Sequence, residues 1–203
     1  MNKKKHWETV YNTKTPQEVS WTQKYPKTSI EFIKSLKIDS SKPIIDVGGG
    51  DSYLVDVLIK EGYTDITVLD ISEKALLLAQ ERLGENAKKV SWIVCDILDF
   101  KPNKNYSIWH DRASFHFLTE PSQIKRYTEK VNHCVLEGLV IGTFSKKGPL
   151  KCSGLDISQY DFDKLTANFK ENFNTIEEKE EVHITPFDTM QNFTFMSFRK
   201  KTN

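Results

Sequence analysis

Three consecutive glycines follow directly after a short buried-strand pattern, and this junction constrains the fold more than any other feature of the chain. Residues 43–47, with the sequence PIIDV, read as a strand, and Gly48, Gly49 and Gly50 read as a tight turn after it. Glycines carry no side chain, so a ligand can approach the backbone of the turn and the N-terminus of the next helix. We therefore expect a strand-turn-helix unit with a ligand site at the turn.

The same strand-then-helix alternation recurs along the chain. Further strands are predicted after the first one, and the pattern ends in two β-rich runs that follow a helix over residues 162–169. The predicted strands are 43–47, 66–70, 90–94, 106–109 (ending near residues 110–111) and 139–144, followed by the runs 174–184 and 191–199. Strands joined by helices form a parallel sheet covered on both faces. The sequence thus predicts an α/β fold, a doubly wound parallel sheet that ends in an antiparallel hairpin.

Residues 1–42 form a separate lead-in before the glycine turn. Helical patterns at 6–11 and 28–36 are interrupted by Pro16 and Pro26. A chain of 203 residues has room for one core, so we expect a single domain made of the lead-in (1–42) and a ligand-binding part (43–203). The lead-in carries nine lysines and four acidic residues, a net charge of +5 that leaves −4 on the rest. This positive arm fits either an acidic partner or a solvated lysine-rich face.

Composition excludes several classes of protein. The total charge of +1 gives no basic field of the kind that binds duplex nucleic acid, so we expect no nucleic-acid partner. The longest apolar stretch, 136–144, is far below the roughly 18 residues of a membrane span, so we expect no membrane partner either. The basic N-terminus continues into polar residues, which predicts a cytoplasmic location. Three cysteines without CxxC spacing predict neither a disulfide framework nor a zinc site.

Acidic residues occur at the ends of three successive strands. Asp46 precedes the glycine turn, Asp70 ends the second strand, and Asp96 with Ile97 follows the third. Ligands of open α/β sheets bind outside the carboxyl ends of the strands, where a carboxylate can accept both hydroxyls of a ribose. Each aspartate alone can also be a simple helix or turn cap. The three together predict a nucleoside site.

The spacing of the glycines argues against a dinucleotide. A G-x-G-x-x-G fingerprint counted from Gly48 would require glycine at position 53, where the chain has Tyr53. A large side chain there keeps the helix from packing as closely as a pyrophosphate turn requires. The chain is also short for a separate substrate domain.

The segments IIDVGGGDS (44–52), VLDIS (68–72) and CDI (95–97) resemble the successive signatures of class I S-adenosylmethionine-dependent methyltransferases. The resemblance covers nearly the whole chain and implies a Rossmann-like sheet of seven strands whose last strand is reversed. It also implies a cofactor, S-adenosyl-L-methionine, with S-adenosyl-L-homocysteine as product. Its implied contacts are the glycine turn with the methionine part, Asp70 and Ile71 with the ribose, and Asp96 with Ile97 at the adenine. Ser52 stands where that family often has a third glycine, and Asp51 has no counterpart that we can explain.

The flanks are similar to a subgroup of that family that includes protein-lysine methyltransferases. The similarity rests on HWE (6–8), Tyr11, VSW (19–21) and DRASF (111–115). In that subgroup an N-terminal aromatic segment folds over the cofactor, which implies that Tyr11 and Trp21 close the site. Packing of the same two aromatic side chains into an ordinary core is the alternative.

The segment after the fourth strand is the best source of groups that act on a methyl acceptor. We expect His110 beside the cofactor, Asp111 and Arg112 organising the pocket, and His116 as base or hydrogen-bond partner. The alternatives are an Asp111–Arg112 ion pair that holds the loop and a core histidine at position 116. The loop 145–154, with three lysines, and the turn 183–191 are the expected specificity walls. Those lysines attract an anionic acceptor or are simply solvated, and we expect Cys152 to be a bystander.

Methyl transfer needs no metal, and the five histidines show no metal-ligand spacing, so we expect none. The chain lacks the Asn/Asp-Pro-Pro-Tyr motif typical of nucleobase methylases at this position. We therefore expect a small-molecule methyltransferase. A protein-lysine methyltransferase and a nucleoside-binding module without catalysis remain the alternatives, and the sequence leaves the acceptor and the oligomeric state open.

Overall fold

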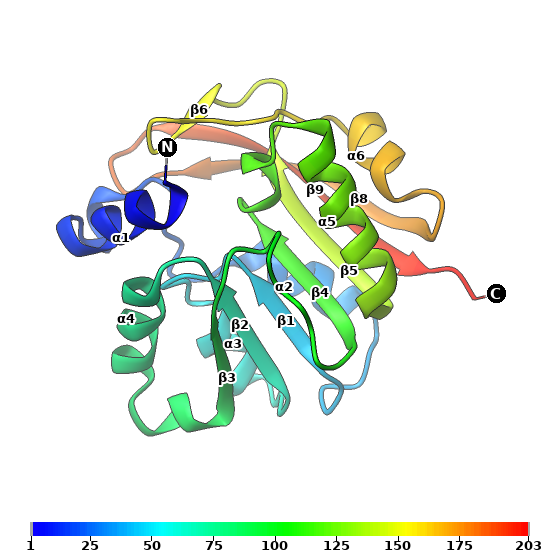
Figure 1. The fold of residues 1–203 in the computed structure, drawn as a ribbon, viewed down its shortest axis with the longest axis horizontal. Helices are drawn as coiled ribbons and strands as arrows, with labels where there is room; N and C mark the ends of the chain where they lie inside the picture. Colours follow the sequence, from blue (N-terminus) through cyan, green and yellow to red (C-terminus); the bar gives the residue numbers. More distant parts are fainter. Residues whose placement is uncertain (1, 203) are drawn as a thin grey trace.

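The computed structural model describes residues 2–202. Figure 1 shows helices on both sides of a central sheet, and a two-stranded hairpin lies apart from it. The helices are α1 (Lys3–Thr13), α2 (Lys27–Ser35), α3 (Leu54–Lys60), α4 (Glu73–Leu83), α5 (Pro121–Cys134) and α6 (Phe162–Phe169), with 3₁₀ turns at Pro16–Glu18, Gly84–Lys89 and Phe115–Phe117. The strands are β1 (Ile44–Val47), β2 (Ile66–Asp70), β3 (Val90–Val94), β4 (Tyr106–Arg112), β5 (Val135–Phe144), β6 (Lys151–Cys152), β7 (Leu155–Asp156), β8 (Phe173–Ile184) and β9 (Met190–Lys200).

The sheet has seven strands in the order β3-β2-β1-β4-β5-β9-β8. Strands β1 to β5 of this sheet run parallel, while β9 is antiparallel to both of its neighbours. The expected doubly wound sheet with a reversed last strand is therefore confirmed. The strand order reverses at β1 and β4, and the crevice beside such a switch point is where α/β sheets bind ligands.

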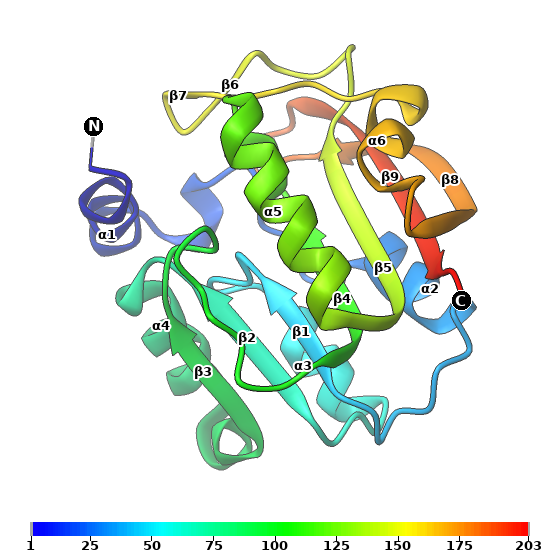
Figure 2. The same ribbon diagram turned by 45° about the vertical axis from the view of Figure 1, so that its right-hand side comes forward.

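Both faces of the sheet are buried, because neighbouring residues of each strand point to opposite sides. On β1, Ile44 packs with α2, α3 and α4, and the next residue, Ile45, packs with α5 and α6. Figure 2 shows α5 in front of the sheet with α2 and α3 behind it. This two-sided burial explains the nearly continuous apolar strands of the sequence.

Strand β4 is longer than the sequence predicts. The sequence predicts that it ends near residues 110–111, and it continues to Arg112, because Asp111 pairs with Val47 of β1 and Arg112 pairs with Gly142 of β5. Residues 110–112 therefore alternate between the two faces of the sheet, which decides where their side chains point.

The lead-in forms helices where the sequence predicts them. Helix α1 lies beside α4, beyond the ends of the strands, while α2 packs against the sheet (Figure 1). The division into a lead-in (1–42) and a ligand-binding part (43–203) stays a prediction. No helix within residues 2–202 has the length and apolar character that crossing a membrane requires.

Candidate nucleoside and acceptor site

A cavity lies at the carboxyl ends of β1, β2 and β4, covered by the lead-in. Most residues predicted for the site line this single cavity. They are Tyr11, Trp21, Asp46, Gly48, Gly49, Asp70, Ile71, Asp96, Ile97, His110 and Arg112. Gly50 lies beside it, since a Cβ at Gly50 would be 2.6 Å from the Tyr11 hydroxyl. These residues therefore share one cavity, their assignment as a binding site stays a prediction, and the part that each can play depends on its contacts.

The glycine turn has no room for side chains. Gly48 adopts a φ of +68°, and a Cβ there would lie 2.5 Å from the Cβ of Ser114. A Cβ at Gly49 would lie 2.7 Å from Oδ2 of Asp46. Both the left-handed conformation and these close approaches require glycine. The turn therefore presents bare backbone to the cavity, as a bound ligand would require.

Asp70 is a buried carboxylate at the end of β2. Its Oδ1 accepts the backbone N–H of Ser72 at 2.8 Å, and the Ser72 hydroxyl in turn caps α4. Burial raises the pKa of Asp70 to about 7, against the opposing effect of the backbone N–H groups of Ser72 and Gly50. Hydroxyl donors from a ligand would stabilise the ionised form of such a carboxylate. Asp70 thus fits a ribose-binding role.

Asp96 and Ile97 lie at the next strand end. Oδ1 of Asp96 accepts the backbone N–H of Leu98 at 2.9 Å, which fixes the carboxylate at the rim of the cavity. Ile97 is buried and belongs to the core on the α5 side. A fixed acceptor beside an apolar surface suits the amine and ring of an adenine.

Asp51 is the turn residue for which the sequence offered no account. It is 9% exposed and lines the cavity, and burial raises its pKa. Arg82 of α4 donates to the backbone carbonyls of Asp51 and Ser52 and pairs with Asp56. Asp51 therefore adds a third acidic side chain, beside Asp46 and Asp70, to one end of the cavity.

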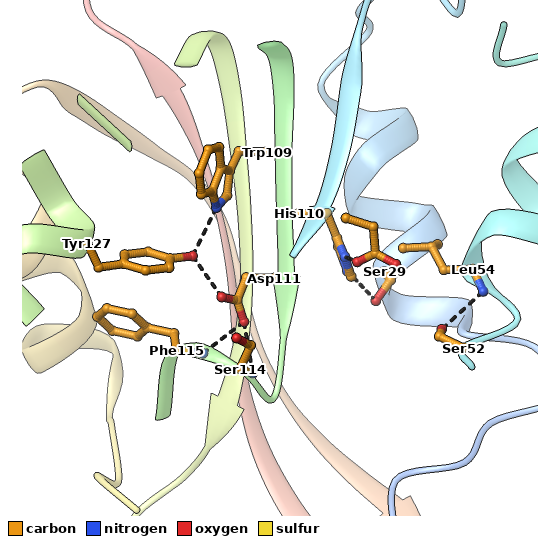
Figure 3. A network of polar contacts seen from close by, with 10 residues as sticks. Ser29, Ser52, Leu54, Trp109, His110, Asp111, Ser114, Phe115 and Tyr127 are labelled. Atoms are coloured by element: carbon orange, nitrogen blue, oxygen red, sulfur yellow. Dashed lines mark hydrogen bonds and ion pairs between the residues drawn. The ribbon is translucent and has the colours of Figure 1, made fainter. Parts of the chain in front are cut away.

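His110 takes part in a buried chain of hydrogen bonds (Figure 3). Its Nδ1 lies 2.7 Å from Oδ1 of Asp46, and its Nε2 lies 2.9 Å from the hydroxyl of Ser29 on α2. An ionised carboxylate only accepts, so we assign the proton to Nδ1 and let Nε2 accept from Ser29. His110 lines the cavity as expected, but both of its ring nitrogens are already used by the protein. Ser29 was not predicted as a site residue.

Asp111 points to the other face of the sheet, toward α5. Its Oδ1 accepts the backbone N–H groups of Ser114 and Phe115, and its Oδ2 accepts the Tyr127 hydroxyl at 2.7 Å. Tyr127 also accepts from the indole of Trp109, and Figure 3 shows this group on the opposite side of β4 from His110. The catalytic role expected for Asp111 is thereby corrected: it anchors the turn after β4 and does not face the cavity. It is held by these partners, not by the Asp111–Arg112 ion pair weighed as an alternative.

His116 is fully buried in the core. Its ring stacks on Phe144 with centroids 4.7 Å apart, and its Nδ1 accepts the Phe144 backbone N–H at 3.3 Å. Burial, aided by the charge of Arg112, lowers its pKa to about 3. A histidine without contact to the cavity cannot reach an acceptor there, so the expected role as base is corrected. The structure matches the alternative of a core histidine.

Arg112, unlike its neighbour, faces the cavity. Its Nη1 donates to the carbonyl of Trp21 at 3.0 Å, and its guanidinium lies 4.8 Å from the ring centroid of Phe193. Burial lowers its pKa to about 10. The guanidinium thus ties β4 to the lead-in and keeps its charge at neutral pH.

Aromatic side chains from the lead-in close the cavity. Trp7 packs edge-to-face on Trp21 and on Phe117, with centroids 5.7 and 5.2 Å apart, and Tyr11 packs on Trp21 at 6.2 Å. Burial and the neighbouring Asp70 hold the pKa of Tyr11 well above its usual value. Trp7 lies in the HWE segment singled out from the sequence, although it was not predicted as a site residue.

Of the two expected specificity walls, the loop 145–154 contributes Cys152 to the cavity. We expected no role for Cys152 from the sequence. Its side chain is buried, and burial raises the pKa of its thiol to about 12. From the other wall, His183 binds the lead-in instead, through the Ser20 carbonyl at 2.7 Å and Gln23 at 3.4 Å. No residue in that stretch carried a motif that could have revealed these contacts.

Comparison with known proteins bears on the binding site expected at the strand ends. Residues 44–138 match the family model described as a methyltransferase domain. The match spans the glycine turn, Asp70 and Asp96, and it agrees with the resemblance of the sequence to class I S-adenosylmethionine-dependent methyltransferases. No curated protein sequence matches the chain.

Solved structures share the fold over nearly the whole chain. A protein studied for the conversion of a disulfide bond into a thioacetal group during echinomycin biosynthesis is 18% identical, with a TM-score of 0.78 over 98% of this chain and 94% of that one. The Burkholderia thailandensis 1,6-didemethyltoxoflavin-N1-methyltransferase, with its substrate and S-adenosylhomocysteine bound, is 13% identical (TM-score 0.70, 98% and 87% covered). The N-methyltransferase NodS of Bradyrhizobium japonicum WM9, bound to S-adenosylhomocysteine, is also 13% identical (TM-score 0.70, all of both chains covered). At these identities the likeness concerns the fold.

Proposed function

We propose that the protein transfers a methyl group from S-adenosyl-L-methionine to a small-molecule acceptor. The observation that carries this proposal is the continuity of the cavity. The same cavity is lined by the glycine turn with Asp70 and Asp96 and by Arg112 and Cys152. A nucleoside cofactor and a second compound therefore have adjoining places in one enclosure.

The residues present fit the proposed cofactor. The glycine turn leaves bare backbone for the methionine part, and Asp70 is a buried carboxylate whose charged form needs donors. Asp96 and Ile97 offer an acceptor and an apolar surface for an adenine. Within residues 2–202, no three His, Cys, Asp or Glu side chains are grouped so that they could hold a metal ion.

When bound, S-adenosylmethionine supplies a methyl group on a sulfonium, so an acceptor's lone pair forms the new bond to carbon as the C–S pair passes to sulfur. The protein's task is to align the acceptor and to exclude water. Trp7, Tyr11, Trp21 and Phe117 provide the apolar cover for that purpose. We further propose residues 1–42 as a lid, because Trp7, Tyr11 and Trp21 all come from them.

A small molecule is the favoured acceptor because the cavity is covered by the lead-in. Two of the similar folds belong to N-methyltransferases, one of them with 1,6-didemethyltoxoflavin bound. A protein-lysine acceptor must pass a side chain beneath the same cover. A nucleoside-binding module without catalysis would share every cofactor contact described above.

Two measurements separate these functions. Calorimetric titration with S-adenosylhomocysteine tests the cofactor site, and absence of binding contradicts the proposal. Incubation of the protein and tritiated S-adenosylmethionine with cell lysate then tests the acceptor: label in the small-molecule fraction supports the proposal, and label in a protein band supports lysine methylation instead. Binding without labelled product in either fraction favours the module without catalysis.

A further inference from the structure

The guanidinium of Arg112 presents an unused edge. Its Nη1 donates to the Trp21 carbonyl, while Nε and Nη2 are buried and have no hydrogen-bond partner. The N–H groups of Nε and Nη2 lie parallel on one edge of a guanidinium, and this edge binds a carboxylate through two hydrogen bonds. Buried donors without partners cost free energy, so such an edge calls for a ligand.

A second buried group without a partner comes from the adjoining segment. The hydroxyl of Thr22, the residue after Trp21, is buried and unpaired, and Thr22 also lines the cavity. The lead-in and β4 therefore each contribute to the lining of this cavity a residue whose side chain has an unused hydrogen-bonding group. Both groups can donate to the oxygens of one ligand.

The charge of Arg112 is not neutralised by a direct contact. Within residues 2–202, no carboxylate lies within 4 Å of its guanidinium nitrogens. Glu181 is the acid that most favours its charged form, yet a carboxylate oxygen of Glu181 accepts from Gln23 at 3.2 Å. A buried guanidinium without a partner attracts an anion strongly, because little water screens it.

The loop lysines, in contrast, are already paired. Lys146 contacts Asp161, Lys147 contacts Glu180 at 2.9 Å, and Lys151 contacts Asp156 at 3.3 Å. They are exposed, and such surface pairs act weakly on a ligand. The lysines that the sequence suggested as an anion attractor therefore have local partners. Lys3 also lines the cavity, and its ammonium donates to the Phe117 carbonyl.

We infer that the methyl acceptor carries a carboxylate, which the free edge of Arg112 and the Thr22 hydroxyl bind. This inference rests on the proposed function and names its substrate class. The carboxylate is the group that the protein holds and not the group that is methylated, because hydrogen bonds from a guanidinium to both oxygens lower their nucleophilicity toward a methyl carbon. Arg112 lies at the β4 and β9 side of the cavity, away from the strand ends that carry Asp70 and Asp96.

The same chemistry has a second source, the carboxylate of the cofactor's methionine part, and a first experiment separates the two. S-adenosylhomocysteine carries this carboxylate and 5′-methylthioadenosine lacks it. Arg112→Gln also removes the bond to Trp21, which affects both compounds alike, so calorimetry should show their affinities changed by factors that agree within about threefold. A loss of about tenfold or more for S-adenosylhomocysteine alone overturns the inference, because Arg112 then binds the cofactor.

A second experiment measures carboxylate binding directly and does not require methyl transfer. The protein loaded with S-adenosylhomocysteine is titrated with propionate, phenylacetate and indole-3-acetate, each beside its uncharged amide, and binding is followed by ligand-observed NMR. At least one acid should bind about tenfold or more tightly than its amide. That preference should disappear in Arg112→Gln and remain in Lys151→Gln, which removes a positive charge from the neighbouring loop.

Arg112→Lys keeps the charge but not the parallel N–H edge, so it should weaken the preference without abolishing it. Melting temperatures confirm that each variant is folded. The inference is overturned if no acid binds better than its amide in the wild type, or if Lys151→Gln removes the preference as fully as Arg112→Gln. Failure of the wild type to bind S-adenosylhomocysteine at all is a different result, which contradicts the proposed function itself.

Discussion

The carboxylate of Glu8 on α1 accepts the backbone N–H of Glu73 at 2.6 Å, at the first residue of α4. Its second oxygen accepts the N–H of Lys74 at 3.3 Å. A carboxylate at a helix N-terminus satisfies unpaired N–H groups and opposes the positive end of the helix dipole. Because Trp7 and Tyr11 lie on the same helix as Glu8, this contact fixes the cover of the cavity onto the element that follows Asp70.

The first prediction concerns this anchor. Replacing Glu8 by alanine should lower the free energy of unfolding by about 0.5–2 kcal/mol, the usual effect of losing a helix cap. It should also lower the affinity for S-adenosylhomocysteine by up to about tenfold, because Tyr11 is held less firmly over the glycine turn. Chemical denaturation and calorimetry measure the two effects. Thr13→Ala on the same helix is the control, since that hydroxyl bonds only within α1, and equal effects of both variants would refute an anchoring role.

Asp70 should dominate the affinity for the cofactor. Asp70→Ala removes a buried hydrogen-bond acceptor. Calorimetry should show the free energy of S-adenosylhomocysteine binding weakened by about 1–3 kcal/mol. Asp99→Ala is a matched control, because Asp99 is an exposed carboxylate near the same edge of the sheet that pairs with Arg126. If a folded Asp70→Ala protein binds S-adenosylhomocysteine as tightly as the wild type, Asp70 does not bind the ribose.

The stability of the ligand-free protein should depend on pH in an unusual direction. Asp70 has a pKa of about 7 in the folded protein and about 3.9 in an unfolded chain, so the folded state binds the extra proton between these values. The contribution of Asp70 to the free energy of unfolding should therefore fall as the pH rises from about 4 to 7. Asp111, with a pKa of about 6, adds to this slope, and His116, whose pKa is lowered to about 3, opposes it. Denaturant titrations across this range should show a shallower fall for Asp70→Asn. A slope equal to that of the wild type would show that Asp70 is not the group responsible.

His116 should matter for stability and not for the methyl transfer step. His116→Ala loses the bond from the Phe144 backbone and should lower the free energy of unfolding by about 1–3 kcal/mol. With the variant kept folded, kcat and the affinity for S-adenosylhomocysteine should each change by less than about threefold. A fall in kcat far beyond this, with stability retained, would restore the role as base.

Local signals predicted the residues of the proposed cofactor site. The glycine turn and Asp70, Asp96 and Ile97 each follow directly from a strand, and the chain direction of a parallel sheet brings strand ends together. The rest of the cavity depends on contacts that sequence spacing cannot show. Ser29 meets a partner 81 positions away in the sequence, and nothing near Ser29 indicates it.

The misassigned residues share one cause, the true end of β4. If the strand ended near residues 110–111, as the sequence predicts, the residues up to 116 would form a loop whose side chains can all reach a ligand. Because the strand runs on to Arg112, pairing with β1 and β5 sends Asp111 toward α5 and Arg112 toward the cavity. His116 then falls on a short 3₁₀ turn that is buried against β5.

Because successive side chains of β4 point to opposite faces of the sheet, substitutions on its two faces have different consequences. Asp111 holds the turn from one side of the sheet, and Arg112 borders the cavity from the other, although the two residues are neighbours in sequence. Substitutions at position 112 can therefore alter which compounds enter without loosening the turn. A lineage could diversify its acceptors by exchanging residues on one face of this strand while the scaffold on the other face stays the same.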